Sequence, residues 1–348
     1  MPQHPSIEQT VGSHAEDSMY RPLRTDDDAA MHSGSSHPEW REAWCFVFFD
    51  QATQVHGIAN LCAYPSQQRV ALWFGVWEGD RGLHMVRKLD VPMQPGQDPR
   101  QVEPLSVRCI APNERWHIAF DDGVAKVDIE WRALSPIYDW EWTQLTGSRH
   151  YEQTGAVTGL IEVAGRRLTV NGFSQRDRSW GPRSFAVVQQ CWTSQVQFSA
   201  DFYSHQSIVT VAGRDYLFGY LMKDGDLQRI ASLYLNIGFA HTWGPPSLTR
   251  AKLVDAAGRS ITYMVEPVNV ISATLAGPVD RVYLHTTFSR FSLGDRSAIG
   301  HVDYWFSSPH LVRSHQVVRD GSMGRMYHLK SAAAHSSGGP AEPAQPPA

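Results

Sequence analysis

The chain has 348 residues, which is enough for two ordinary domains, and 42% of them are hydrophobic. Its formal net charge is −4 and it has no run of lysine or arginine, so a nucleic acid is not an expected partner. The start of the chain lacks a basic region followed by an apolar core, and no stretch approaches about 18 consecutive apolar residues. We therefore expect no signal peptide, no membrane span and a cytoplasmic location, while the oligomeric state is left open.

The two ends of the chain differ in composition from its centre. Residues 1–36 are polar and include the stretch "TDDDAAMHSGSS", which predicts a disordered arm with the fold beginning near His37. Residues 331–348 read "SAAAHSSGGPAEPAQPPA", a low-complexity segment that cannot bury enough apolar surface to offset the entropy of ordering it. This segment is expected to be a disordered tail.

The centre of the chain has the pattern of an all-β protein. Short runs of aromatic and β-branched residues, such as "EAWCFVFFDQ" and "RVALWFGVW", are broken by Gly, Pro, Asn and Asp. Residues 163–166, 211–214 and 256–259 each place an Ala-Gly-Arg sequence between apolar runs, as glycine-containing hairpin turns do. The number of runs is too large for one small barrel, and it favours two antiparallel β-barrels or sandwiches over residues 37–195 and 196–330.

Common catalytic motifs are missing from the sequence. No GxGxxG follows a strand, and GxxxxGK[ST], GxSxG and HExxH are absent. The four cysteines form no CxxC pair and no zinc-like spacing. With 12 Trp, 12 Tyr and 14 Phe, the chain is instead expected to hold a small hydrophobic ligand in an aromatic cavity, with no cofactor and no metal.

The segment Ser174–Arg183, "SQRDRSWGPR", gathers several charges around one carboxylate. Side chains alternate along a strand, so Asp177 should lie on the opposite face from Arg176 and Arg178. In one interpretation Asp177 enters an apolar pocket, where burial raises its pKa and makes it a general acid. In the other interpretation Arg176, Arg178 or Arg183 holds it ionised, as a base, an anchor or a structural lock between the two barrels. Both interpretations remain open from the sequence.

A second carboxylate precedes this segment by one hairpin, in "RHYEQTG". Tyr151 and Glu152 are expected to be cross-strand neighbours of Asp177. Glu152 could raise the pKa of Asp177 and form an acid/base pair with it. The plainer alternative, which we favour, is a salt bridge from Glu152 to Arg176 or Arg178.

Two motifs resemble the lipocalin-like (calycin) superfamily of carotenoid 1,2-hydratases, AttH-type proteins and fungal lipocalin-like Diels–Alderases. The first is "EAWCF", with Glu42, Trp44 and Phe46 at the matching positions, and the second is "DRSWG", with Asp177, Arg178, Trp180 and Gly181. The "RDRSWGPR" form looks most like that of a bacterial branch distinct from the hydratases. The resemblance implies two lipocalin-like barrels side by side, and an aspartate at the place of Asp177 that protonates an isoprenoid double bond.

The resemblance also draws attention to the second barrel. Members often carry a glycine followed by a Glu/Asp-Tyr pair near their C-terminal strands, and Asp303-Tyr304 in "GHVDYWF" is similar to it. These two side chains would line the cavity, although such a pair often only forms local hydrogen bonds. His241, in "FAHTWGPPS", is expected in a loop at a barrel mouth and is a further candidate for substrate binding.

These features together favour an enzyme that acts without a cofactor on an isoprenoid, polyene or steroid-like substrate. Asp177 would protonate a double bond, with Arg178, Tyr151 and Glu152 beside it, and water addition, isomerisation or cyclisation would follow. Trp44, Trp180 and Tyr151 would stabilise positive charge through their π faces. Two alternatives are a non-catalytic carrier of an apolar ligand and a pericyclase that only shapes its substrate.

Overall fold

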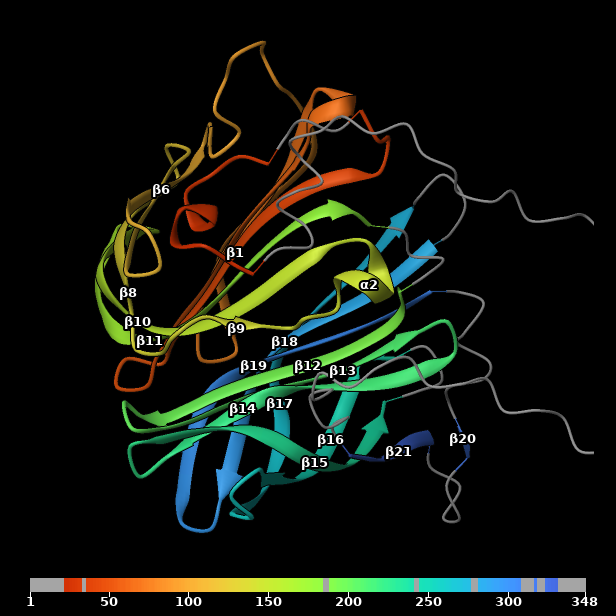
Figure 1. The fold of residues 1–348 in the computed structure, drawn as a ribbon. Helices are drawn as coiled ribbons and strands as arrows, with labels where there is room; N and C mark the ends of the chain where they lie inside the picture. Colours follow the sequence, from red (N-terminus) through yellow and green to blue (C-terminus); the bar gives the residue numbers. More distant parts are fainter. Residues whose placement is uncertain are drawn as a thin grey trace, which may run out of the picture.

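The structure is a computed structural model that describes residues 22–32, 36–183, 188–240, 244–276, 281–307, 316–317 and 323–330. Within these ranges almost all regular structure is β-strand, arranged in two antiparallel sheets that lie side by side (Figure 1). The prediction of an all-β protein with two barrel-like units is confirmed. No helix in the described ranges is both long and apolar enough to cross a membrane.

The first sheet has 11 strands from the N-terminal half of the chain. Its strands are β1 (Trp40–Asp50), β2 (Val55–Tyr64), β3 (Arg69–Glu78), β4 (Arg81–Pro92), β5 (Gln101–Val102), β6 (Leu105–Ala111), β7 (Arg115–Asp121), β8 (Ala125–Ala133), β9 (Tyr138–Asp139), β10 (Arg149–Val163) and β11 (Arg166–Pro182). They pair in the order β4-β3-β2-β1-β11-β10-β8-β7-β6-β5, and β9 pairs with β10. The short helices of this half are η1 (Thr25–Asp28), η2 (Pro65–Gln67) and α2 (Thr143–Thr146).

The second sheet has 10 strands from the C-terminal half. Its strands are β12 (Val188–Ser199), β13 (Phe202–Val211), β14 (Arg214–Lys223), β15 (Asp226–Phe239), β16 (Pro246–Asp255), β17 (Ser260–Ala276), β18 (Arg281–Leu293), β19 (Arg296–Ser307), β20 (Gln316–Val317) and β21 (Met323–Lys330). They pair in the order β14-β13-β12-β19-β18-β17-β16-β15-β21-β20, and an additional pairing of β14 with β15 closes a barrel.

The predicted hairpin turns are present. Residues 163–166 join β10 to β11, and 211–214 join β13 to β14. In the first of these turns Ala164 and Gly165 have φ values of +52° and +72°, the left-handed region that two-residue hairpin turns require at both positions. The turn at 256–259 is longer, with four residues between β16 and β17, and Gly258 has a φ of +82°. Turn chemistry and the alternating pattern therefore set the strand register together.

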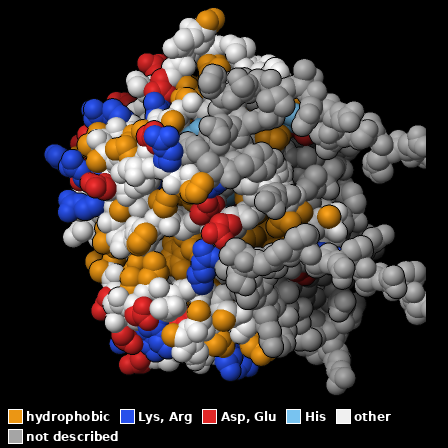
Figure 2. Space-filling view, in the orientation of Figure 1, with side chains coloured by type: hydrophobic (Ala, Val, Ile, Leu, Met, Phe, Trp, Pro, Cys, Tyr) orange, Lys and Arg blue, Asp and Glu red, His pale blue; other side chains and the backbone are white. Residues whose placement is uncertain are grey.

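Each sheet encloses its own apolar core, and a third cluster lies between the sheets. The intermediate cluster includes Val47, Ile58, Trp77, Phe288 and Ile299, and the Trp77 and Phe288 ring centroids are 5.5 Å apart. Figure 2 shows hydrophobic side chains gathered at the height where the two sheets meet in Figure 1, with charged side chains spread above and below them. The two barrels are thus packed against each other rather than joined only through the chain.

Part of the predicted disordered arm belongs to the fold. Residues 22–32 lie against the first barrel, where Asp28 is 1% exposed and accepts a hydrogen bond from Arg176 Nη1 at 2.7 Å. His32 is also buried and stacks on Trp180, with ring centroids 4.0 Å apart. The expectation that the fold begins near His37 is wrong for this segment, because its charges have buried partners that a polar composition does not reveal.

The chain passes from the first sheet to the second between β11 and β12. β12, which the predicted boundary at residue 195 divides, pairs along its length with β13 and β19 of the second sheet. The polar residues of β12 that suggested an interruption are therefore part of a strand. The other limits of the two predicted domains, at residues 37 and 330, remain predictions.

Candidate functional site

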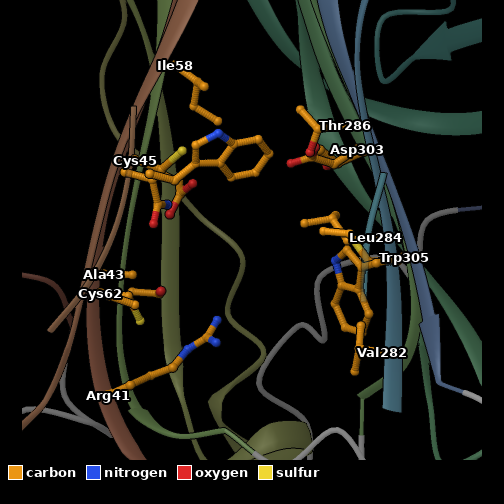
Figure 3. Close-up of a pocket in the computed structure, with 18 of the residues that line it drawn as sticks. Arg41, Ala43, Cys45, Ile58, Cys62, Val282, Leu284, Thr286, Asp303 and Trp305 are labelled. Atoms are coloured by element: carbon orange, nitrogen blue, oxygen red, sulfur yellow. The ribbon is translucent and has the colours of Figure 1, made fainter. Parts of the chain in front are cut away.

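A cavity of about 320 Å³ lies between the two barrels, and we call it the inter-barrel cavity. One wall consists mainly of residues from β1, β2, β3, β4, β10 and β11, and the other of residues from β12, β17, β18 and β19. Figure 3 shows Arg41, Ala43 and Cys45 on the first wall facing Asp303 and Trp305 on the second. Residues at every second position of β1 face the cavity, as the alternation of side chains requires.

Strand register places Asp177 in this cavity. Asp177 lies opposite Glu152 on β10 and opposite Cys45 on β1, and all three residues line the cavity. Arg176 and Arg178 point into the first barrel, as the predicted alternation requires. The cavity lies between the barrels, however, and not in the mouth of either one.

The two buried arginines, Arg176 and Arg178, pair with other carboxylates, and neither forms an ion pair with Asp177. Arg176 binds Asp28 and donates to Gln153 Oε1 at 2.6 Å, while Arg178 forms a buried ion pair with Glu42. For Asp28 and Glu42, burial favours the neutral acid, but the arginine charges and hydrogen bonds outweigh it and hold both pKa values below their usual range.

Asp177 has the electrostatic environment of a general acid. Burial raises its pKa to about 7, and the nearby charge of Glu152 acts in the same direction. His150 and Arg41 oppose this shift, and Asp303 supports it. No described residue forms a hydrogen bond with the Asp177 carboxyl, and the effect of burial and of Glu152 outweighs the opposing effect of His150 and Arg41. Of the two interpretations, the geometry favours the acid over the lock.

Glu152 is held by neutral partners. His150 Nε2 donates to Glu152 Oε1 at 3.0 Å, and Gln175 Nε2 donates to the other carboxyl oxygen at 2.9 Å. Burial raises the pKa of Glu152 and lowers those of His150 and His205 to about 4, so both imidazoles are neutral at pH 7. The salt bridge that we favoured between Glu152 and Arg176 or Arg178 is wrong, since both arginines lie inside the barrel.

Asp303 brings a third carboxylate from the second barrel. Its Oδ1 accepts a hydrogen bond from Thr286 Oγ1 at 2.6 Å and lies 3.3 Å from His301 Nε2. Asp303 therefore lines the cavity as predicted, whereas its neighbour Tyr304 is fully buried in the core of the second barrel.

The aromatic wall of the cavity differs from the predicted one. Trp44 and Trp180 are about 1% exposed and pack inside the first barrel, so they cannot contact a ligand in the cavity. The aromatic residues that line the cavity are Tyr64, Trp73, Trp140, Trp142 and Trp305. Trp140 and Trp142 come from the segment "YDWEW", where an alternation of tryptophans near a short strand was the available signal.

Two further predicted residues are likewise separated from Asp177. Tyr151 faces the first barrel and donates its hydroxyl to Asp28, and Arg178 lies on the same side. The predicted catalytic group is thus divided, with Asp177 and Glu152 in the cavity and Tyr151 and Arg178 in the barrel core. Arg183 lines the cavity, and His241 falls outside the described residues. Where the chain is described, no group of three His, Cys, Asp or Glu side chains is arranged to hold a metal ion.

Solved structures with a similar fold are known. The crystal structure of CghA with Sch210972 has a TM-score of 0.60 at 11% identity, covering 78% of this chain and 89% of that chain. Kievitone hydratase from Nectria haematococca has a TM-score of 0.54 at 10% identity, with coverages of 77% and 89%. An AttH-type protein from Nitrosomonas europaea has a TM-score of 0.58 at 12% identity, with coverages of 82% and 97%. At these identities the likeness shows the fold.

These structures share the overall fold of the chain, and the presence of an AttH-type protein and a hydratase among them agrees with the resemblance seen in the sequence. The chain itself belongs to the family described as "Domain of unknown function (DUF7064)", whose profile matches residues 25–306. No curated protein matches the sequence. The relation of the "RDRSWGPR" motif to one bacterial branch stays a prediction.

Proposed function

We propose that this protein is an enzyme that protonates a carbon–carbon double bond of a hydrophobic substrate in the inter-barrel cavity. The observation that carries the proposal is the Asp177 carboxyl, which faces this cavity with a pKa raised to about 7 by burial and by Glu152. A carboxyl with this pKa is largely protonated at slightly acidic to neutral pH, and an acid of matched pKa is effective in proton transfer. The substrate class is an isoprenoid, polyene or steroid-like molecule.

The chemical step needs only one proton and the electron pair of the double bond. The Asp177 O–H proton moves to one alkene carbon, the π electrons form the new C–H bond, and the other carbon becomes a cation. Water then adds to this carbon and its extra proton returns to the Asp177 carboxylate, which completes a hydration. Loss of a neighbouring C–H proton to the same carboxylate gives an isomerisation. Attack by a second double bond forms a ring and moves the positive charge to a new carbon, which then loses a C–H proton to the same carboxylate to complete a cyclisation.

The cavity offers groups that stabilise this cation. Trp73, Trp140 and Trp305 place π faces or edges along the walls, and π faces attract positive charge most strongly where water is excluded. Glu152 and Asp303 add negative charge near Asp177. This assigns to the cavity tryptophans the role that the sequence suggested for Trp44 and Trp180.

The fold comparison supports the proposal at the level of architecture, because kievitone hydratase, a hydratase by name, has the same two-barrel fold. The test is turnover by Asp177→Asn, which keeps the size of the side chain and removes its acid. Extracted apolar metabolites would be incubated with protein and analysed by mass spectrometry. Products shifted by the mass of water, or isomers, that form only with the wild type support the proposal. Ligands returned unchanged indicate a carrier, and full activity of Asp177→Asn indicates a pericyclase.

A further inference from the structure

The inter-barrel cavity is electrically polarised along the strands of its first wall. Arg41 lies opposite Gly181 on β11, and Cys45 lies opposite Asp177, so Arg41 and Asp177 are four register positions apart. At about 3.3 Å per residue this separation is roughly 13 Å between backbone positions. Figure 3 shows Arg41 at one end of the cavity and Asp303 at the other.

Two arginines, Arg41 and Arg183, lie at the same end of the cavity, which we call the cationic end. Arg183 lines the cavity, and its backbone N–H donates to Glu39 O at 3.1 Å, which places it beside the start of β1 and near Arg41. Both side chains are half-buried, so water screens their charges only in part. A third lining cation, Arg87, is exposed on β4 opposite Trp73 and lies away from this end.

The carboxylates that line the cavity among the described residues are at the opposite end. Glu152 and Asp177 face each other, and Asp303 acts electrostatically on both. Between the two ends the walls are mainly apolar, with residues such as Ala43, Ala273 and Leu284. A negative group on a ligand would be repelled from the carboxylate end and attracted to the guanidinium end.

We propose that the substrate of this cavity is an anionic amphiphile, with one carboxylate or comparable anion held by Arg41 and Arg183 and an apolar body that extends toward Asp177. Guanidinium groups match the planar geometry of carboxylates and bind them through paired hydrogen bonds. The anion fixes the orientation, and the reacting double bond lies about 10–13 Å from it along the strand direction. Because it concerns the molecule on which Asp177 acts, this inference rests on the proposed function.

The test uses two dyes that differ only by one anionic group. These are 8-anilinonaphthalene-1-sulfonate and its neutral parent N-phenyl-1-naphthylamine, and their affinities are measured by fluorescence titration at pH 8. We expect the sulfonate to bind the wild type about tenfold more tightly, the gain of one charge-assisted contact. Raising the salt concentration should reduce this preference, because partly exposed charges are screened. Equal affinities for the two dyes would overturn the proposal.

Variants assign the preference to the arginines. Arg41→Gln and Arg183→Gln should each lose most of the preference for the sulfonate while binding the neutral dye as before. Arg183→Lys, which keeps the charge, should retain most of it, and Arg108→Gln, an exposed arginine on β6, is the matched control. A preference that survives both glutamine variants, with folding verified by thermal melting, contradicts the inference.

Asp177→Asn separates this inference from the proposed function. It removes a group at the other end of the cavity, so it should not weaken binding of the sulfonate dye. Lost turnover with retained dye preference agrees with both proposals. If Asp177→Asn retains both turnover and the preference for the sulfonate dye, the acid role of Asp177 is refuted and the anion site is not. If Asp177→Asn loses the preference for the sulfonate dye although Arg41 and Arg183 are intact, the anion site is refuted.

Discussion

Glu152 on β10 and Asp177 on β11 lie directly opposite each other in the antiparallel register, and both carboxyls face the inter-barrel cavity. Glu152 is hydrogen-bonded to His150 and Gln175, whereas Asp177 accepts no hydrogen bond from any described residue. Two carboxyls on paired strands that face the same cavity cannot both ionise freely, and the one with fewer hydrogen bonds keeps its proton to higher pH. We therefore expect the pair to titrate as a coupled unit in which Asp177 keeps its proton to higher pH than Glu152.

The pH dependence of turnover should report this acid. Asp177 acts in its protonated form, so the rate should fall as pH rises through about 7, the value to which burial and Glu152 raise its pKa. The measurement is a pH–rate profile of the wild type between pH 5 and 9. A rate that instead rises across this range would mean that the ionised carboxylate is the active form.

The same raised pKa predicts how stability changes with pH. The folded protein retains a proton on Asp177 that the unfolded chain releases near its ordinary pKa of 3.8, so stability is lost as pH rises from about 4 through about 7. Asp177→Asn removes this loss and should raise the free energy of unfolding at pH 8 on the order of 2 kcal/mol. Urea denaturation at pH 5 and pH 8 measures it. A destabilised variant at pH 8 would show that Asp177 is a lock after all.

Replacing Glu152 tests the coupling directly. Glu152→Gln keeps the size of the side chain and removes the charge that raises the pKa of Asp177, so the falling limb of the pH–rate profile should move to lower pH by about one unit. Glu162→Gln is the control, because Glu162 lies on the same strand with an exposed side chain and only a distant partner in Arg167. An unchanged profile in Glu152→Gln would assign the high pKa of Asp177 to burial alone.

The buried ion pair between Asp28 and Arg176 should matter greatly for folding. Asp28→Asn leaves the Arg176 guanidinium without its charge partner inside the barrel, and breaking such a pair costs about 3–5 kcal/mol. Asp26→Asn, on the same short helix, removes an exposed pair with Arg24 and should change stability by less than about 1 kcal/mol. Chemical denaturation midpoints compare the two. Similar midpoints for both variants would show that residues 22–32 add little to the fold.

Strand alternation made the faces around Asp177 predictable, but not what each face contacts. The pattern separates Asp177 from Arg176 and Arg178, and the structure agrees. From Ser174 onward both faces of β11 are largely buried, however, one inside a barrel and one between barrels, and periodicity cannot tell these apart. The ion pair between Arg176 and Asp28 could not be predicted for another reason. Asp28 is 148 residues away in the sequence, in a segment whose composition is typical of disorder.

The tryptophans show a similar limit. Trp44 and Trp180 belong to the motifs on which the sequence resemblance rests, and both side chains pack in the core of the first barrel. Trp140, from a connecting segment, lines the cavity instead. Hydrophobic type alone does not distinguish a side chain that fills a core from one that lines a cavity, because both positions exclude water.

Filling the cavity should stop ligand binding without unfolding the protein. Ala273 on β17 lines the cavity, and Ala273→Phe would place a ring in the space that a substrate needs. Thr274, the next residue, is exposed and points to the other side of the strand, so Thr274→Phe is the matched control. We expect Ala273→Phe to lose binding of both naphthalene dyes and turnover by at least about tenfold, with a melting temperature close to that of the control. Turnover that persists in Ala273→Phe would place the reaction outside the inter-barrel cavity. It would also refute the role assigned to Asp177.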